Sequence, residues 1–396
     1  MNPMNLALGL LLAGAASTPL ASPFTPAGDD EIVQRLPYRI DAGARAQRSR
    51  VAQGQSPLPA ALETARAAIE RSRRHGDPRE LGLAQAALAP WWSLPAPPPA
   101  VRLLRATVRQ SQHDFDVALA DLDLLVRPDP ATPLPVQAQA ELTRAAVLQV
   151  TGRLAEARAG CERLGSARFA ALGSSVATAA QACVAELHSL QGRAREADAE
   201  LTALAARAQD AGDGSWLALV RAELAERRGD GAAAATRFGE VMRAGADVYA
   251  RAAYADWLLD GRRYAEVLIL LPAADSDADA LLLRRAIALH RLRDPQAASA
   301  AGALQARFDA AHARGDTTHA REEGRFALDV RGDAGAALKL AQANWARQKE
   351  PADAVLLARA AAAAGNREAA EPLRRLVHET GWADVRLAAA DRSLQP

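Results

Sequence analysis

Two cysteines are the residues of this chain whose chemistry is simplest to assign. Cys161 and Cys183 are the only cysteines among its 396 residues. We expect each to lie on a helix, in two consecutive helices that contact each other. In an oxidising compartment such a pair can form a disulfide, provided that the Cα atoms approach within about 7 Å. The alternative is two buried thiols that pack as small apolar side chains, and the sequence leaves both open.

The seven histidines are the other candidates for catalysis or metal binding. The nearest arrangement to a metal site spans a predicted turn and consists of His312, Asp316, His319 and Glu322. This spacing matches no metal motif of known geometry, so surface histidines are the favoured interpretation. The chain also lacks HExxH, GxSxG and CxxC motifs and a glycine-rich phosphate loop. We therefore expect no catalytic residue, metal or cofactor, and a metal-dependent enzyme centred on His312 and His319 is the less favoured alternative.

A recurring Arg-Ala pair offers a different chemistry, the binding of a partner. It stands seven residues before four predicted turns, and its arginines are Arg105, Arg144, Arg221 and Arg285. A row of guanidinium groups can hold the carbonyls or carboxylates of a peptide. The favoured alternative is that each arginine pairs with a neighbouring acidic residue and holds the repeats in register, because these positions lie near the packing seam. The other polar residues expected on the same face are Gln110, Gln149 and Glu226.

Two adjacent tryptophans precede the segment SLPAPPP, which favours a polyproline conformation. Trp91 and Trp92 could form a binding patch, because tryptophan is enriched at interaction hot spots. The favoured interpretation is that both indoles cover the gap between successive helical hairpins, since buried aromatic rings dominate core packing.

The elements that carry these residues are helical hairpins, of which Glu141–Leu164 is the clearest copy. Apolar residues recur at helical spacing in both halves of the segment. Gly152 separates the halves, because glycine accepts the left-handed conformation that ends a helix. The apolar stripe of the second half consists of Leu154, Ala157, Cys161 and Leu164. One such hairpin cannot bury its apolar faces alone and needs neighbours.

This hairpin resembles the tetratricopeptide repeat. The small residue of the family's first helix, its turn glycine, the large apolar residue that follows and the alanine of its second helix correspond to Ala145, Gly152, Leu154 and Ala157. Turns recur at steps of about 32 to 40 residues, close to the 34 of the family, at Gly76, His113, Gly152, Gly192, Gly229, Gly261, Arg293/Asp294, Gly332 and Gly365. The resemblance covers roughly residues 60–380 and implies an all-α, right-handed α-solenoid of about nine hairpins. It also implies that the first helix of each hairpin faces a protein or peptide partner.

The composition agrees with a helical fold and argues against a nucleic-acid-binding protein. Hydrophobic residues make up 49% of the chain but aromatic residues only 4%, and alanine, the strongest helix former, is abundant. The formal net charge is +1, which argues against a nucleic-acid-binding protein. Many carboxylates have an arginine three or four residues away, as Glu223 and Arg227 do, and these are interpreted as solvent-exposed helix pairs.

The N-terminal residues predict export. Residues 1–22 resemble a signal peptide, because the apolar run Leu6–Ala16 is too short to span a bilayer and small residues follow it. We expect an extended leader over 23–58, the repeats over 59–380 and a capping segment over 381–396. The mature chain should be a soluble periplasmic protein without a membrane-spanning segment. The favoured function is an adaptor for an envelope protein or peptide, and the alternative is a spacer that self-associates through Trp91 and Trp92.

Overall fold

The computed structural model describes residues 57–208, 211–275, 278–313, 315–316 and 318–394, together with positions 28, 46 and 49. The predicted signal peptide and leader therefore lie almost entirely outside the described residues. Contacts divide the chain into residues 1–38 and 39–396, and everything described below belongs to the second unit. Among the described residues, no helix combines the length and the apolar character that a membrane span requires.

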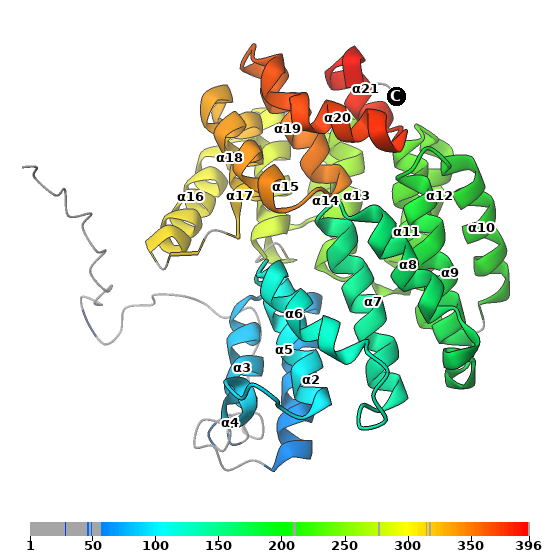
Figure 1. Cartoon of the computed structure of the whole chain (residues 1–396). Coiled ribbons are helices and arrows are strands. Elements are labelled where there is room, and N and C mark those ends of the chain that lie inside the picture. The colour runs from blue at the N-terminus through cyan, green and yellow to red at the C-terminus, as the bar shows by residue number, and fades with distance from the viewer. Residues whose placement is uncertain are drawn as a thin grey trace, which may run out of the picture. The chain divides into compact units, whose positions relative to one another are not determined.

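Nine helical hairpins follow one another in the described part of this unit (Figure 1). Their first helices are α2 (Leu58–His75), α5 (Pro99–Ser111), α7 (Leu134–Val150), α9 (Ser174–Ser189), α11 (Ala211–Arg227), α13 (Val248–Asp260), α15 (Asp279–Leu292), α17 (Ala320–Phe326, continued by η3, Ala327–Arg331) and α19 (Pro351–Ala363). Their second helices are α3 (Arg79–Ala87), α6 (Phe115–Leu125), α8 (Leu154–Leu164), α10 (Ala194–Arg207), α12 (Gly231–Gly245), α14 (Tyr264–Leu270), α16 (Ala297–Ala313), α18 (Ala334–Arg347) and α20 (Glu371–Thr380, preceded by η4, Arg367–Ala370). The short elements are α4 (Ala89–Trp92), η1 (Ala167–Leu172), η2 (Ala273–Asp275), α21 (Val385–Ala390) and η5 (Arg392–Leu394). No strand occurs among the described residues, and the predicted all-α solenoid of about nine hairpins is confirmed.

The turns explain why the hairpins recur where they do. In eight of the nine hairpins a residue predicted at the turn has a positive φ. The sixth differs, because Gly261 has φ −76° and Arg262 takes the left-handed conformation at φ 56°. In the third hairpin the left-handed residue, Gly152, stands two positions before the second helix begins at Leu154. In the sixth hairpin Arg262 holds the same position before Tyr264. The predicted turn at Gly261 is therefore one residue too early.

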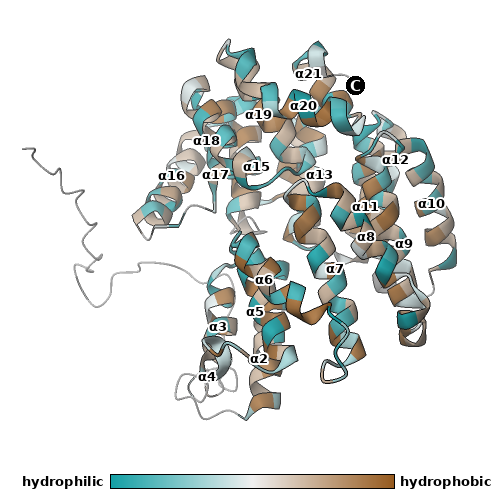
Figure 2. Cartoon of the chain, in the orientation of Figure 1, coloured by the Kyte–Doolittle hydropathy of each residue, from teal (hydrophilic) through white to brown (hydrophobic). Residues whose placement is uncertain are grey.

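Small residues allow the helices of a hairpin to approach closely. Ala145 on α7 and Ala157 on α8 are both fully buried. A Cβ atom added to Gly160 would lie 3.5 Å from the Cβ of Ala145, which is ordinary van der Waals contact. Apolar and polar positions alternate along the helices (Figure 2), as amphipathic helices packed into a stack require. Successive hairpins thus bury apolar clusters between them, of which one extends from α5 to α9.

Hairpins that are distant in sequence also touch. Helix α2 contacts α13. A Cβ atom added to Gly76, in the turn after α2, would lie 2.9 Å from the Cβ of Ala278. The backbone N–H of Lys349, between α18 and α19, donates a 2.7 Å hydrogen bond to the carbonyl of Val150 at the end of α7. The stack is therefore not held by neighbouring hairpins alone.

Candidate binding surfaces

The first two arginines of the repeated Arg-Ala pair make ion pairs within the chain. Arg105 on α5 donates hydrogen bonds of 2.7 and 2.6 Å to the two carboxylate oxygens of Asp121 on α6. Arg144 on α7 donates from Nε to Asp123, also on α6, over 2.6 Å. Both arginines thus connect a first helix to the second helix of the same or the preceding hairpin.

The other two arginines make the same kind of connection through neutral acceptors. Arg221 on α11 donates to Thr202 Oγ1 on α10 over 2.9 Å. Arg285 on α15 donates to the carbonyl of Leu271, at the end of α14, over 2.9 Å. These contacts agree with the interpretation that the arginines hold the hairpins in register, and a role in partner binding stays a prediction.

The three other polar residues predicted on this face differ in their surroundings. Gln110 is partly buried on α5. Gln149 on α7 donates from Nε2 to Glu186 on α9 over 2.8 Å. Glu226 on α11 is 3.0 Å from Arg386 of α21, so the C-terminal segment contacts a residue predicted to meet a partner.

The segment after α20 packs against hairpin turns in the middle of the chain. Arg386 bonds to Asp384 through Nη2 and Oδ2 at 2.7 Å, so its charge is shared between Asp384 and Glu226. Burial raises the pKa of Glu226 to about 8, against the opposing effect of Arg386. A Cβ atom added to Gly192, in the α9–α10 turn, would lie 3.0 Å from the carbonyl oxygen of Gly381. The predicted capping segment thus reaches beyond the last hairpin.

A partly buried ion-pair network connects the first helices of the later hairpins. Asp256 on α13 accepts hydrogen bonds from Arg284 on α15, at 3.0 and 2.6 Å, and from Arg325 on α17. Asp329 on η3 accepts from Arg359 on α19. Burial opposes ionisation of Asp256, but the guanidinium groups of Arg284 and Arg325 hold its pKa below the ordinary value. Both carboxylates are paired within the chain, which reduces their value for binding a partner.

The predicted exposed pair of Glu223 and Arg227 on α11 is wrong. Glu223 accepts a 2.7 Å hydrogen bond from the hydroxyl of Tyr249 on α13. Arg227 is buried and donates to Ser189 Oγ on α9 over 2.9 Å. Helix α11 packs against α9 and α13 as well as its hairpin partners, so both side chains turn to neighbouring helices. Burial also raises the pKa of Glu223 to about 7.

The tryptophan pair forms the short helix α4. Both indoles are partly buried and pack against the core of the first two hairpins. Arg105 donates to the carbonyls of Trp92 and Leu94. The guanidinium of Arg109 lies 5.4 Å from the centre of the Trp92 ring. Trp91 and Trp92 therefore have the contacts of residues that cover a gap between hairpins, and their role in binding stays a prediction.

The histidines singled out from the sequence form two separate pairs. His312 Nε2 lies 2.9 Å from Glu323 Oε1, and His319 Nε2 lies 3.3 Å from Asp316 Oδ2. Glu322 lies beside Arg321 instead, at 3.7 Å. Within the described part of the chain, these four residues do not assemble into a set of three metal ligands.

The two cysteines are joined. Cys161 on α8 and Cys183 on α9 form a disulfide with their Cα atoms 5.8 Å apart, and both residues are buried. The bond connects the second helix of the third hairpin to the first helix of the fourth. Of the two alternatives that the sequence left open, the structure contains the disulfide.

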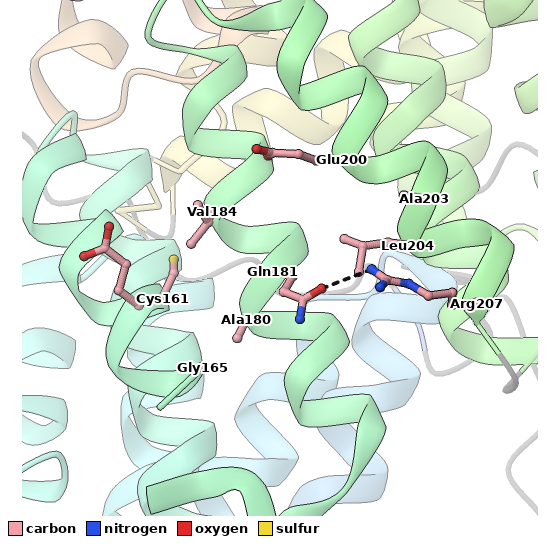
Figure 3. A pocket seen from close by; sticks show the side chains of 10 residues that line it. Cys161, Gly165, Ala180, Gln181, Val184, Glu200, Ala203, Leu204 and Arg207 are labelled. Carbon is pink, nitrogen blue, oxygen red and sulfur yellow. Dashed lines mark hydrogen bonds between the residues drawn. The ribbon is translucent and has the colours of Figure 1, made fainter. Parts of the chain in front are cut away.

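An apolar pocket of about 400 Å³ lies beside this disulfide, between α8, α9 and α10 (Figure 3). Small residues leave the space, because Gly165, Ala180 and Ala203 come from three consecutive helical segments and line the same cavity. The remaining lining residues are Cys161, Glu162, Gln181, Val184, Glu200, Leu204 and Arg207. Sequence reasoning missed this pocket, whose only signal was small residues at facing positions of adjacent helices.

Polar groups stand at the rim of the pocket. Figure 3 shows the side chains of Gln181 and Arg207 pointing toward each other from α9 and α10. Their hydrogen bond, from Arg207 Nη2 to Gln181 Oε1, is long at 3.4 Å. Because it is long and exposed, a partner's amide can replace it at little cost. The pocket thus combines apolar walls with exchangeable donors and acceptors.

Comparisons with known proteins find likeness among solved structures only. No protein-family model matches the chain, and no curated protein sequence matches it either. Among solved structures it matches the TPR domain of P58(IPK), determined by crystallography at 2.5 Å. The identity is 16%, the match covers 85% of this chain and 97% of that one, and the TM-score is 0.17. With so low a TM-score, the fold assignment rests on the helices and contacts described above.

Proposed function

We propose that this chain is an exported, periplasmic scaffold that binds a segment of another protein, and that the pocket between α8, α9 and α10 anchors that segment. A solenoid of helical hairpins offers a long surface on which a partner chain can lie. The pocket is the observation that carries the proposal, because it provides an apolar space with hydrogen-bonding groups at its rim.

The size of the pocket defines the class of partner. A volume of about 400 Å³ is at the lower end of the range for ligand sites. It accommodates one large aromatic or aliphatic side chain, while Gln181 and Arg207 can bond to the peptide groups on either side of it. The preferred partner is therefore a peptide segment with one large apolar residue.

Two observations support export. Residues 1–22 have the pattern of a signal peptide. The disulfide between Cys161 and Cys183 is the kind of bond that persists in oxidising compartments and is rare in the cytosol. A fusion of residues 1–22 to a reporter enzyme that is active only outside the cytoplasm tests the first point, and a reporter that stays inactive would contradict export.

Filling the pocket tests the proposed binding site. Ala203 is exposed and lines the pocket, so Ala203→Trp should occupy the space without disturbing the core. Ala206 is exposed on the same helix but does not line the pocket, so Ala206→Trp is the matched control. Each purified protein is probed with an array of peptides carrying one large apolar residue, and hits are measured by calorimetry. We expect Ala203→Trp to weaken binding at least tenfold and Ala206→Trp to leave it unchanged. Equal affinities for the two variants would show that the pocket is not the site.

Self-association through the tryptophan pair is the second candidate. It is less favoured, because both indoles pack against the core of the first two hairpins. Sedimentation of the wild-type protein and of Trp91→Ala distinguishes the self-associating spacer from the peptide-binding scaffold. A dimer that Trp91→Ala converts to a monomer would support the spacer function.

A further inference from the structure

We infer that His188, Glu196 and Glu200 form a binding site for one divalent transition-metal ion, with zinc the best match. The ligand atoms of these three side chains all lie within 4.8 Å of one another. No other such set of three occurs among the described residues. The inference does not depend on the proposed function, because it concerns a different ligand and is tested by a different measurement.

The helices place the three groups together. Glu196 and Glu200 are four residues apart on α10, so they share one face of the helix. His188 lies in the last turn of α9, on the other side of the hairpin turn. Its Nδ1 is 3.1 Å from Glu200 Oε2. Two ligands bonded to one tetrahedral zinc ion at about 2.0–2.1 Å are separated by roughly 3.3 Å, so this pair already has the spacing of metal ligands.

The donors suit zinc. Imidazole nitrogen and carboxylate oxygen are both zinc ligands, and three of them leave a fourth tetrahedral position for water or another ligand. The two carboxylates also balance the charge of a divalent ion. His188 is only 8% exposed, so packing holds its ring in place, while the exposed Glu196 can rotate to complete the set.

An arginine competes with the ion for one ligand. Arg193 donates from Nε to Glu196 over 2.6 Å and also bonds through Nη2. Both side chains are close to half exposed, so this ion pair is weak and the ion can displace it. Arg193 therefore sets the affinity of the site without being a ligand.

The site adjoins the apolar pocket. Glu200 belongs both to the group of three and to the pocket lining (Figure 3). In the figure its side chain extends from α10 toward α9 at one end of the pocket. An ion bound to Glu200 would therefore lie close to that end of the pocket.

Titration of the full chain with zinc alone tests the inference. Calorimetry should show one equivalent bound, and cobalt(II) in its place should give the visible absorption of a tetrahedral site. His188→Ala should abolish binding, and Glu200→Gln, which keeps the size of the side chain, should weaken it at least tenfold. Arg193→Ala should tighten binding severalfold, an effect that a merely structural cluster would not show.

Two control variants make the result decisive. His312→Ala removes the other histidine that contacts a single glutamate, and it should leave zinc binding unchanged. Ala206→Trp, on the same helix as Glu200 but outside the pocket lining, should also leave zinc binding unchanged. Less than one equivalent of zinc bound, or equal affinities for the wild-type protein and both ligand variants, would overturn the assignment.

Discussion

At the scale of single residues, Glu226 shows how burial and pairing compete. Its carboxylate faces Arg386, but Arg386 is already paired with Asp384, and one Glu226 oxygen, Oε1, is buried without a hydrogen-bond partner. Removal from water therefore outweighs the shared cation, and the pKa of Glu226 rises to about 8. The native protein keeps a proton here that the unfolded chain releases above about pH 4.5.

This difference predicts that Glu226 reduces stability as pH rises. Between about pH 4.5 and 8 the unfolded state loses the proton and the native state does not, so the free energy of unfolding falls with pH. Glu226→Gln mimics the neutral form and should be more stable than wild type at pH 8, by on the order of 3 kcal/mol, and nearly equal to it at pH 5. Urea unfolding at both values measures the difference.

The exposed Glu368 provides the control for this experiment. Glu368→Gln should change stability little and equally at both pH values. If the stability difference between the wild-type protein and Glu226→Gln were the same at pH 8 as at pH 5, the raised pKa would be contradicted.

At the same scale, the sequence gives side-chain types but not their partners. The sequence identified Glu223 and Arg227 as neighbours on one helix face. In the structure Glu223 pairs with Tyr249 of α13, and Arg227 pairs with Ser189 of α9. The spacings from His188 to Glu196 and Glu200 likewise match no ligand motif. The three side chains meet only because of the turn between α9 and α10. Such pairings depend on packing between helices, which single-sequence patterns do not encode.

At the scale of elements, prediction was much more successful. The turn spacing located all nine hairpins, since left-handed turn residues and apolar stripes are local signals. The sixth turn was misplaced by one residue because Gly261 drew the assignment away from Arg262. The 3₁₀ turn η1 and the separate helix α4 were not foreseen, and neither has the periodicity of a longer helix.

The disulfide between α8 and α9 should stabilise the pairing of two elements. The two cysteines are separated by 22 positions in the sequence, so the bond closes a loop of about that length. The loss of chain entropy in the unfolded state predicts that Cys161→Ser with Cys183→Ser lowers the free energy of unfolding by about 3 kcal/mol. Urea unfolding of the double variant in non-reducing buffer measures this, and a matching loss on reduction of the wild-type protein is the control. A double variant as stable as the oxidised wild-type protein would contradict a stabilising bond.

At the scale of the molecule, contacts between distant hairpins should make stability sensitive to a single turn residue. Gly76 and Gly365 have the same φ of 65°. A Cβ at Gly76 would lie 2.9 Å from Ala278, whereas nothing lies within 4 Å of one at Gly365. Both alanine variants incur the left-handed penalty of about 1 kcal/mol, so Gly76→Ala should destabilise the protein by about 1–3 kcal/mol more than Gly365→Ala.

Urea unfolding of both variants measures that excess. Equal losses would mean that the first hairpin does not press on the segment before α15 in solution. The sequence could not have predicted this contact, because the repeat pattern specifies each hairpin's neighbours but not which distant hairpins meet.

The hydrogen bond from Lys349 to Val150 has a consequence for how this protein can change over evolution. Solenoids held only by adjacent repeats can lengthen or shorten by duplication or deletion of a unit, since every junction is alike. Here, removal of one hairpin between residues 150 and 349 would carry the donor away from its acceptor. A change in the number of repeats in that interval would therefore break this contact, and related chains should differ there more by substitution and loop length than by repeat count.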